Sequence, residues 1–257
     1  MPVGRTFRQR VLARELLVGT FLNLGSPAAA EVCAHAGLDW VLVDLEHGAG
    51  GDGELLGMLQ AIAGSDATAL VRVEQATRLR IGRALDLGAE GVMMPRVETA
   101  AEAAEIATWL RYPPAGVRGV AVFTRGLAYG AGGHASVAPR NDELVGMFQI
   151  ESRQAVDSAS DIAAIDGVDV LFVGPADLSH ALGIPGQIDH ADYQAAIDSV
   201  GRAARDRGKA AGVLLWRPAD VDRYAALGYS FFSVSSEAAL MQTAVRAEAS
   251  DVRSRLA

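Results

Sequence analysis

Short apolar runs alternate with amphipathic segments along most of the chain. Eight runs have the length and β-branched content of strands that are buried on both faces: 17–22, 40–45, 69–73, 91–94, 145–150, 168–173, 210–215 and 231–234. Helical patterns lie between them, beginning with 27–36, 53–63, 78–87 and 98–111. Eight strands that alternate with helices predict an α/β fold, a (β/α)8 TIM barrel that forms a single domain over residues 1–257.

Two segments stand outside this alternation. Residues 112–143 contain two consecutive prolines and many glycines, and they are too long for an ordinary connection. We expect this loop to lie over the catalytic face of the barrel, with a plain flexible insertion as the alternative. The tail, residues 241–256, has a helical pattern and is expected either to cap the barrel or to pack on a neighbouring subunit.

Composition and charge exclude several classes of protein. The net charge of −8, without a basic patch, argues against a nucleic-acid partner. The sequence has no apolar run long enough to span a bilayer and no signal-peptide pattern, so we expect a soluble protein without a membrane partner. The single cysteine, Cys33, rules out an intrachain disulfide, and its apolar surroundings predict an inert thiol and a cytoplasmic location.

Acidic residues follow two of the predicted strands, Glu151 after 145–150 and Asp177 after 168–173. Barrel enzymes place their chemistry at this end of the strands, where two carboxylates can converge on one divalent cation. The alternative is that both residues merely begin the helices that follow, since acidic side chains favour the positive end of a helix dipole. Gly174-Pro175 favours a binding site, because glycine allows backbone to approach a ligand and a helix N-terminus offers free N–H donors.

A histidine and an arginine lie at the ends of two further strands. His47 follows Asp44 and Glu46, and a carboxylate that binds one imidazole nitrogen leaves the other as a base. The alternative is a surface or structural histidine. Arg72 lies among apolar residues of the third strand and therefore needs an anionic partner, either a substrate oxyanion or one of these carboxylates. Together with a cation, this set suits the stabilisation of an enolate next to a carboxylate.

Several motifs in this order resemble the HpcH/HpaI family of class II, metal-dependent pyruvate aldolases, typified by 4-hydroxy-2-oxoheptanedioate aldolase and 2-dehydro-3-deoxyglucarate aldolase. The resemblance covers residues 19–240. The motifs that carry it are Gly37-Leu38-Asp39-Trp40, Asp44-Leu45-Glu46-His47, Val71-Arg72, Tyr112-Pro113-Pro114-Ala115-Gly116-Val117-Arg118-Gly119, Gln149-Ile150-Glu151 and Gly174-Pro175-Ala176-Asp177-Leu178-Ser179.

The resemblance implies a role for each of these residues. Glu151 and Asp177 would bind Mg²⁺ or Mn²⁺, with Co²⁺ or Zn²⁺ as alternatives, and the cation would chelate pyruvate. Arg72 would stabilise the enolate oxygen, and His47, oriented by Asp44, would transfer protons. The substrate would be bound by Gln149, Gly174, Pro175, Ala176, Asp177, Leu215 and, from a neighbouring subunit, Asp86. The family is usually a homohexamer, a dimer of trimers.

Some positions depart from the family pattern. Phe21 stands where many members have tryptophan, residues 127–136 are rich in glycine, and Leu215-Trp216 places an indole at the rim. These positions should shape the aldehyde pocket, so the identity of the aldehyde is not carried over from the family.

The expected function is that of a lyase that reversibly cleaves a 4-hydroxy-2-oxoacid into an aldehyde and pyruvate or hydroxypyruvate. One alternative is a lyase of the citrate lyase β or malyl-CoA lyase type, which needs a basic groove for nucleotide phosphates. Arg118 and Arg125 are the only candidates for such a groove. The other alternative is a non-catalytic barrel that binds a small carboxylate.

Overall fold

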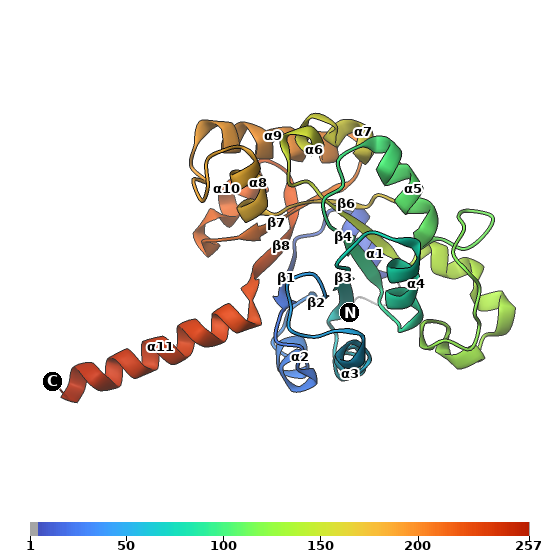
Figure 1. Cartoon of the computed structure of the whole chain (residues 1–257), viewed down its shortest axis with the longest axis horizontal. Helices are drawn as coiled ribbons and strands as arrows, with labels where there is room; N and C mark the ends of the chain where they lie inside the picture. The colour runs from blue at the N-terminus through green and yellow to red at the C-terminus, as the bar shows by residue number, and fades with distance from the viewer. Residues whose placement is uncertain (1–4, 257) are drawn as a thin grey trace.

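The protein forms a closed barrel of eight parallel strands in chain order, surrounded by helices (Figure 1). The computed structural model describes residues 5–256. The strands are β1 (Leu17–Leu22), β2 (Trp40–Asp44), β3 (Thr68–Arg72), β4 (Gly91–Met94), β5 (Val145–Gln149), β6 (Val170–Val173), β7 (Ala210–Leu215) and β8 (Tyr229–Ser236). The predicted fold class is confirmed.

Most of the helices cover the outside of the barrel, except α1, which closes its amino end, and α11, which extends away from it. The helices are α1 (Phe7–Leu12), α2 (Pro27–Ala34), α3 (Asp52–Ile62), α4 (Arg78–Asp86), α5 (Ala100–Leu110), α6 (Arg153–Asp157), α7 (Ala159–Ala163), α8 (Pro175–Ala181), α9 (Ala191–Asp206), α10 (Val221–Ala226) and α11 (Glu237–Leu256). Within residues 5–256, no helix combines the length and the apolar content needed to cross a bilayer.

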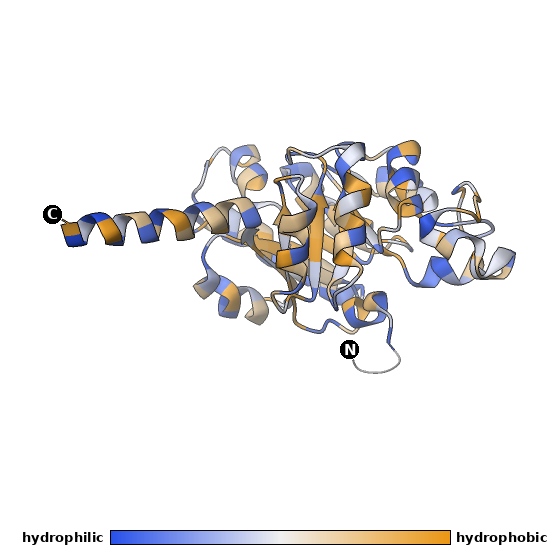
Figure 2. Ribbon diagram, turned by 90° about the horizontal axis from the view of Figure 1, so that it is seen from below, coloured by the Kyte–Doolittle hydropathy of each residue, from blue (hydrophilic) through white to orange (hydrophobic). Residues whose placement is uncertain are grey.

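Alternate residues of each strand face the barrel interior, and Figure 2 shows the strands as an apolar centre. The interior holds large side chains, and the ring of Trp40 stacks on that of Phe231 with centroids 4.5 Å apart. Phe7 and Val11 of α1 belong to the same cluster and close the amino end of the barrel. Polar inward-facing residues are thereby left at the carboxyl end, where the candidate site lies.

The long segment 112–143 does not lie over the catalytic face, so this expectation was wrong. It contains three 3-10 turns, η1 (Arg125–Gly130), η2 (Gly133–Ser136) and η3 (Ala138–Asp142). The Arg125 guanidinium donates to the carbonyl oxygens of Leu59 (3.1 Å) and Leu87 (2.9 Å), which lie near the ends of α3 and α4. A connection from a helix to the next strand starts at the amino end of a barrel, and the contacts of Arg125 keep it there.

The C-terminal helix was predicted correctly, but it does not cap its own barrel. In Figures 1 and 2, α11 extends away from the body of the protein. Glu237 is its only buried residue among those described, whereas Met241, Val245 and Val252 are more than half exposed. Packing of this helix on a neighbouring subunit stays a prediction.

The contact between β1 and β2 provides a test of the interior packing. A Cβ atom at Gly19 would overlap with the Trp40 ring and with its carbonyl oxygen. We therefore expect Gly19→Ala to lower the free energy of unfolding by about 1–3 kcal/mol, measured by urea denaturation. Gly53→Ala is the control, because a Cβ there meets no atom within 4 Å. Equal effects of the two substitutions would contradict this account of the packing.

Candidate active site

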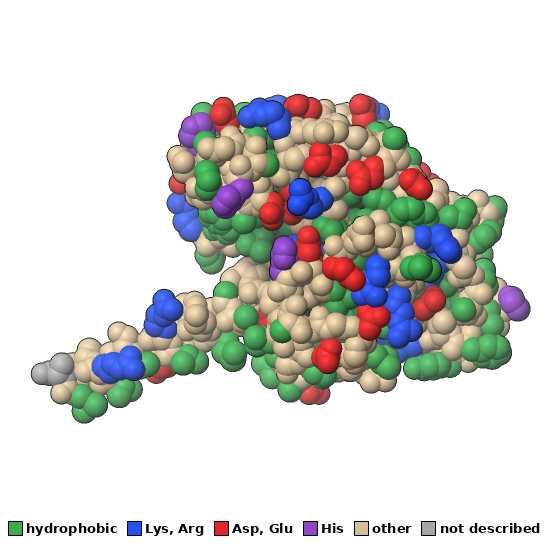
Figure 3. Space-filling view, viewed as in Figure 1, with side chains coloured by type: hydrophobic (Ala, Val, Ile, Leu, Met, Phe, Trp, Pro, Cys, Tyr) green, Lys and Arg blue, Asp and Glu red, His purple; other side chains and the backbone are tan. Residues whose placement is uncertain are grey.

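A cavity of about 370 Å³ opens at the carboxyl ends of the strands. Histidine and acidic side chains gather around a hollow in the middle of this face (Figure 3). The cavity is lined by Phe21, Asn23, Asp44, His47, Arg72, Gln149, Glu151, Phe172, Gly174, Pro175, Ala176, Asp177, Leu214, Trp216, Ser235 and Ser236. The structure therefore brings together nearly all of the site residues that the sequence predicted.

An ion pair between Asp44 and Arg72 lies at the centre of the polar part of the cavity. The two residues are direct partners across β2 and β3, and both side chains point into the barrel. Arg72 donates from Nε to Asp44 Oδ1 (2.9 Å) and from Nη2 to Oδ2 (2.7 Å), and its Nη1 lies 3.0 Å from Glu46 Oε2. Burial alone would raise the pKa of Asp44, but the hydrogen bonds and charge of Arg72 outweigh it and hold the pKa below its ordinary value.

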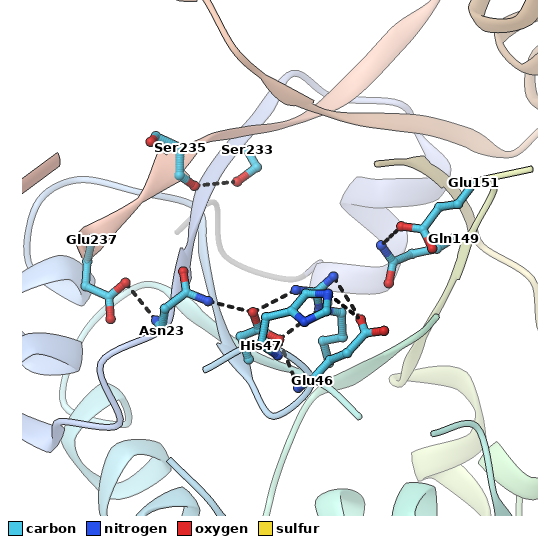
Figure 4. A network of polar contacts seen from close by, with 10 residues as sticks. Asn23, Glu46, His47, Gln149, Glu151, Ser233, Ser235 and Glu237 are labelled. Atoms are coloured by element: carbon cyan, nitrogen blue, oxygen red, sulfur yellow. Dashed lines mark hydrogen bonds and ion pairs between the residues drawn. The ribbon is translucent and has the colours of Figure 1, made fainter. Parts of the chain in front are cut away.

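Asn23 and Glu237 extend this network (Figure 4), and the sequence analysis missed both. Asn23 Nδ2 donates to Asp44 Oδ2 at 2.6 Å. The buried carboxylate of Glu237 accepts hydrogen bonds from the backbone N–H groups of Asn23 and Leu24, each at 2.7 Å. Asn23 directly follows β1, so its position at the carboxyl end of a strand could have identified it as a site residue. Glu237 carried no comparable signal, because its contact joins residues far apart in the chain.

The expectation that Asp44 orients the imidazole of His47 was wrong. Asp44 Oδ1 accepts from the backbone N–H groups of Glu46 (3.1 Å) and His47 (3.3 Å) instead. The His47 ring has its Nε2 atom 3.8 Å from Glu46 Oε2, and its side chain is 62% exposed. The reason is that β2 ends at Asp44, so the chain turns and carries the imidazole to the rim while the Asp44 carboxylate stays inside.

Glu151 and Asp177 both line the cavity, but within residues 5–256 no basic side chain forms an ion pair with them as Arg72 does with Asp44. Glu151 is 7% exposed, and burial, followed by repulsion from Asp177, raises its pKa to about 8. Gln149 Nε2 donates to Glu151 Oε1 at 2.5 Å, whereas Gln149 Oε1 is buried without a hydrogen-bond partner among the described residues. Gly174 allows this close approach, because a Cβ atom there would overlap with Glu151 Oε1 and the carboxylate would have to shift.

The start of α8 supplies donors to the same region. Gly174 is the N-cap residue and Pro175 the first residue of the helix, so the N–H groups of Ala176 and Asp177 have no carbonyl of a preceding turn to bind. Both residues line the cavity. These N–H groups suit an anionic substrate group, and the carboxylate oxygens of Glu151 and Asp177 suit a hard cation. In residues 5–256 no cluster of three or more His, Cys, Asp or Glu side chains forms a more complete metal site.

Two predicted substrate-binding residues lie elsewhere in the protomer. Leu215 points outward into the layer between strands and helices, so its predicted place in the pocket was wrong. Its neighbours Leu214 and Trp216 line the cavity instead. Asp86 lies on α4 and accepts a hydrogen bond from Arg118 at 2.7 Å, outside the cavity of its own protomer. Its contribution to a neighbour's site stays a prediction.

Comparisons with known proteins place the chain among aldolases. The family model described as HpcH/HpaI aldolase/citrate lyase matches residues 17–244. A hydroxypyruvate/pyruvate aldolase from Pseudomonas aeruginosa is 37% identical over 251 residues, which cover 96% of this chain and 91% of that protein. A 5-keto-4-deoxy-D-glucarate aldolase from Klebsiella pneumoniae subsp. pneumoniae is 37% identical over 240 residues, 93% of each chain.

A solved structure shows the same likeness in three dimensions. The crystal structure of an HpcH/HpaI aldolase/citrate lyase family protein from Burkholderia cenocepacia J2315 superposes with a TM-score of 0.91 at 37% identity, covering 96% of this chain and 98% of that one. Relatives named as aldolases match nearly the whole chain, which identifies the protein as a carbon–carbon lyase. The resemblance seen in the sequence motifs is thus confirmed, and the chain belongs to the HpcH/HpaI aldolase/citrate lyase family.

Proposed function

We propose that the protein is a divalent-metal-dependent aldolase that reversibly cleaves 4-hydroxy-2-oxoacids into an aldehyde and pyruvate or hydroxypyruvate. The observation that carries this proposal is the pair of carboxylates, Glu151 and Asp177, placed beside Arg72 in one cavity without a cation of their own. The names of the aldolase relatives support the same reaction class.

The residues around Glu151 fit a divalent cation. Glu151 is buried with a raised pKa, Asp177 repels it, and the oxygen of Gln149 has no partner among the described residues. Mg²⁺ and Mn²⁺ prefer such oxygen ligands, and we propose one of them, with Co²⁺ or Zn²⁺ as alternatives. When bound, the cation supplies positive charge that stabilises a developing enolate. Glu151 and Asp177 would hold it.

The other site residues have distinct tasks in this reaction. The Arg72 guanidinium has five N–H donors, of which three point to Asp44 and Glu46, so two remain for the oxygen on which negative charge grows. The free N–H groups of Ala176 and Asp177 would bind the substrate carboxylate. His47 would transfer the proton of the C4 hydroxyl, because its imidazole reaches the cavity from the rim.

Two alternative chemistries lack the residues they need. A CoA thioester requires cations for its phosphates, but Arg118 pairs with Asp86 and Arg125 binds backbone carbonyls. A Schiff base requires a lysine in the cavity, and the single lysine of the chain, Lys209, precedes β7 at the amino end of the barrel. A non-catalytic barrel would differ from an aldolase in showing no metal-dependent exchange of pyruvate methyl protons with solvent.

Metal dependence should be visible in both activity and stability. EDTA should abolish turnover, and added Mn²⁺ should restore it in the wild type but not in Asp177→Ala. In the metal-free protein, folding raises the pKa of Glu151 from 4.5 to about 8, so the native state retains a proton that the unfolded chain releases. This contribution to stability is present below pH 4.5 and is lost as the pH rises towards 8.

We therefore expect the Tm of the chelated protein to fall between pH 5 and pH 8, with a flatter profile in Glu151→Gln. Because protons compete with the cation for Glu151, Mn²⁺ should raise the Tm of the wild type more at pH 8 than at pH 6. Thermal unfolding at fixed Mn²⁺ concentration measures this difference. Identical shifts at both pH values, in wild type and variant alike, would argue against Glu151 as a ligand.

Asp44 should act through Arg72 rather than through His47. Asp44→Asn removes the charge that holds the guanidinium, so exchange of pyruvate methyl protons should fall on the order of 10²-fold, as expected for the loss of an oxyanion donor. Asp52→Asn is the matched control, because it weakens a surface pair with Arg80 instead. Proton NMR in deuterated buffer measures the exchange. A wild-type rate in Asp44→Asn would show that the ion pair is dispensable.

We also propose that the protein is a homo-oligomer, with the homohexamer of the family as the expected form, in which α11 packs on another copy. Met241, Val245 and Val252 share one face of this helix and are all exposed, and Figure 3 shows hydrophobic side chains along it. Val245→Asp should reduce the molar mass measured by light scattering after gel filtration. Arg246→Asp, on another face, should leave it unchanged. Equal masses for both variants would exclude this interface.

A further inference from the structure

We infer that the aldehyde handled by this site is uncharged, and that the site disfavours aldehydes that carry a carboxylate. The inference rests on the proposed function, since it concerns the aldehyde half of the same cavity. It is carried by the sector that β7, β8 and β1 contribute to the cavity wall. This sector is lined by Phe21, Asn23, Leu214, Trp216, Ser235 and Ser236.

The sector lies between the two charged parts of the site. Around the closed barrel, β7, β8 and β1 lie between β6, which precedes Asp177, and β2, which carries Asp44. Figure 4 shows Ser235 and Asn23 on the opposite side of the cavity from Gln149 and Glu151. An aldehyde that is released from the donor carbon, or that the enolate carbon of the donor attacks, therefore has this uncharged wall beside it.

The cations near this wall are already paired. Each of the three nitrogens of the Arg72 guanidinium lies beside Asp44 or Glu46, and its two remaining N–H donors are those assigned above to the enolate oxygen. The imidazole of His47 lies beside Glu46. Arg217 follows Trp216 directly in the chain, but it does not line the cavity and is held by carboxylates at the surface, Asp189 at 3.0 Å and Asp220 at 2.9 Å.

A second carboxylate on the substrate would therefore gain no partner of its own. It would lose water on entering the cavity without gaining an opposite charge. This cost opposes a charged aldehyde and does not arise for a neutral one.

The wall offers apolar surface and neutral hydrogen-bonding groups instead. Phe21 is buried, Leu214 is half-buried, and Trp216 is 41% exposed at the rim. Such surface suits the carbon chain of the aldehyde. The amide of Asn23 and the hydroxyl of Ser235 suit an oxygen of a hydroxylated aldehyde, because neither group carries charge.

The backbone of Ser235 supports a binding role for this wall. Its φ of 59° lies in the left-handed region, which is unfavourable for residues other than glycine. The conformation occurs where the register between β8 and β1 shifts, and the Ser235 carbonyl accepts hydrogen bonds from the hydroxyls of Thr20 and Ser233, each at 3.3 Å. These two hydrogen bonds stabilise the strained backbone and thereby keep Ser235 in the cavity wall.

The first experiment compares two aldehydes of equal chain length with the wild-type protein in its native assembly. Pyruvate and Mn²⁺ are supplied with either butanal or succinic semialdehyde, and kcat/KM is measured for aldol addition. We expect the uncharged aldehyde to be favoured by about tenfold or more. An equal or higher value for the semialdehyde would overturn the inference.

A second experiment places a cation in the wall. Leu214→Arg should shift the ratio of the two kcat/KM values towards the semialdehyde by about tenfold, and Trp216→Arg, at the exposed rim, tests the same point if the first variant does not fold. Leu16→Arg adds the same charge at the amino end of the barrel, where the side chain is 66% exposed, and should leave the ratio unchanged. No shift in either cavity variant would also overturn the inference.

Failure of the inference and failure of the proposed function are distinguishable. Exchange of pyruvate methyl protons by the wild type needs no aldehyde and reports the donor half of the reaction alone. No exchange, and no addition with any aldehyde, would refute the aldolase function. Normal exchange with a preference for the semialdehyde would refute only the uncharged acceptor.

Discussion

The ion pair of Asp44 and Arg72 is the interaction on which the carboxyl end of the barrel depends. Removing two such charges from water costs several kcal/mol per ion, and only well-formed hydrogen bonds repay this cost. Here the pair makes two direct hydrogen bonds, with Asn23 and Glu46 as further partners. Because the loss of either charge would leave the other buried and unpaired, the pair fixes the ends of β1, β2 and β3 relative to one another.

The second charged group of the site has the opposite character. The hydrogen bonds and charge of Arg72 lower the pKa of Asp44, whereas burial, followed by repulsion from Asp177, raises the pKa of Glu151 to about 8. The first arrangement is rigid and belongs to the fold. The second has no such partner among the described residues, and under the proposed function it would bind an exchangeable cation. One barrel end would thus hold a fixed guanidinium and a metal, with the substrate oxygens between them.

The exposed helix α11 is connected to the site at its first residue. Glu237 is buried and binds the backbone N–H groups of Asn23 and Leu24, and Asn23 in turn binds Asp44. The orientation of α11 and the position of Asn23 therefore depend on the same carboxylate. In an assembly that packs α11 on another copy, the interface and the site would share this short chain of contacts.

The sequence by itself determined the architecture and most of the charged residues of the site. Apolar runs gave strand bounds that match β1, β4 and β7, and since parallel strands end on the same side, acids after two strands had to meet at one end. Only the tertiary structure decided which residues touch. Closure of the barrel decides which of two successive strand residues points inward. Leu214 therefore faces the cavity, and Leu215 faces the helices. Because β2 and β3 are paired, the Asp44 carboxylate binds Arg72 and not the imidazole of His47. A buried guanidinium without a partner would cost more free energy than an exposed imidazole without one.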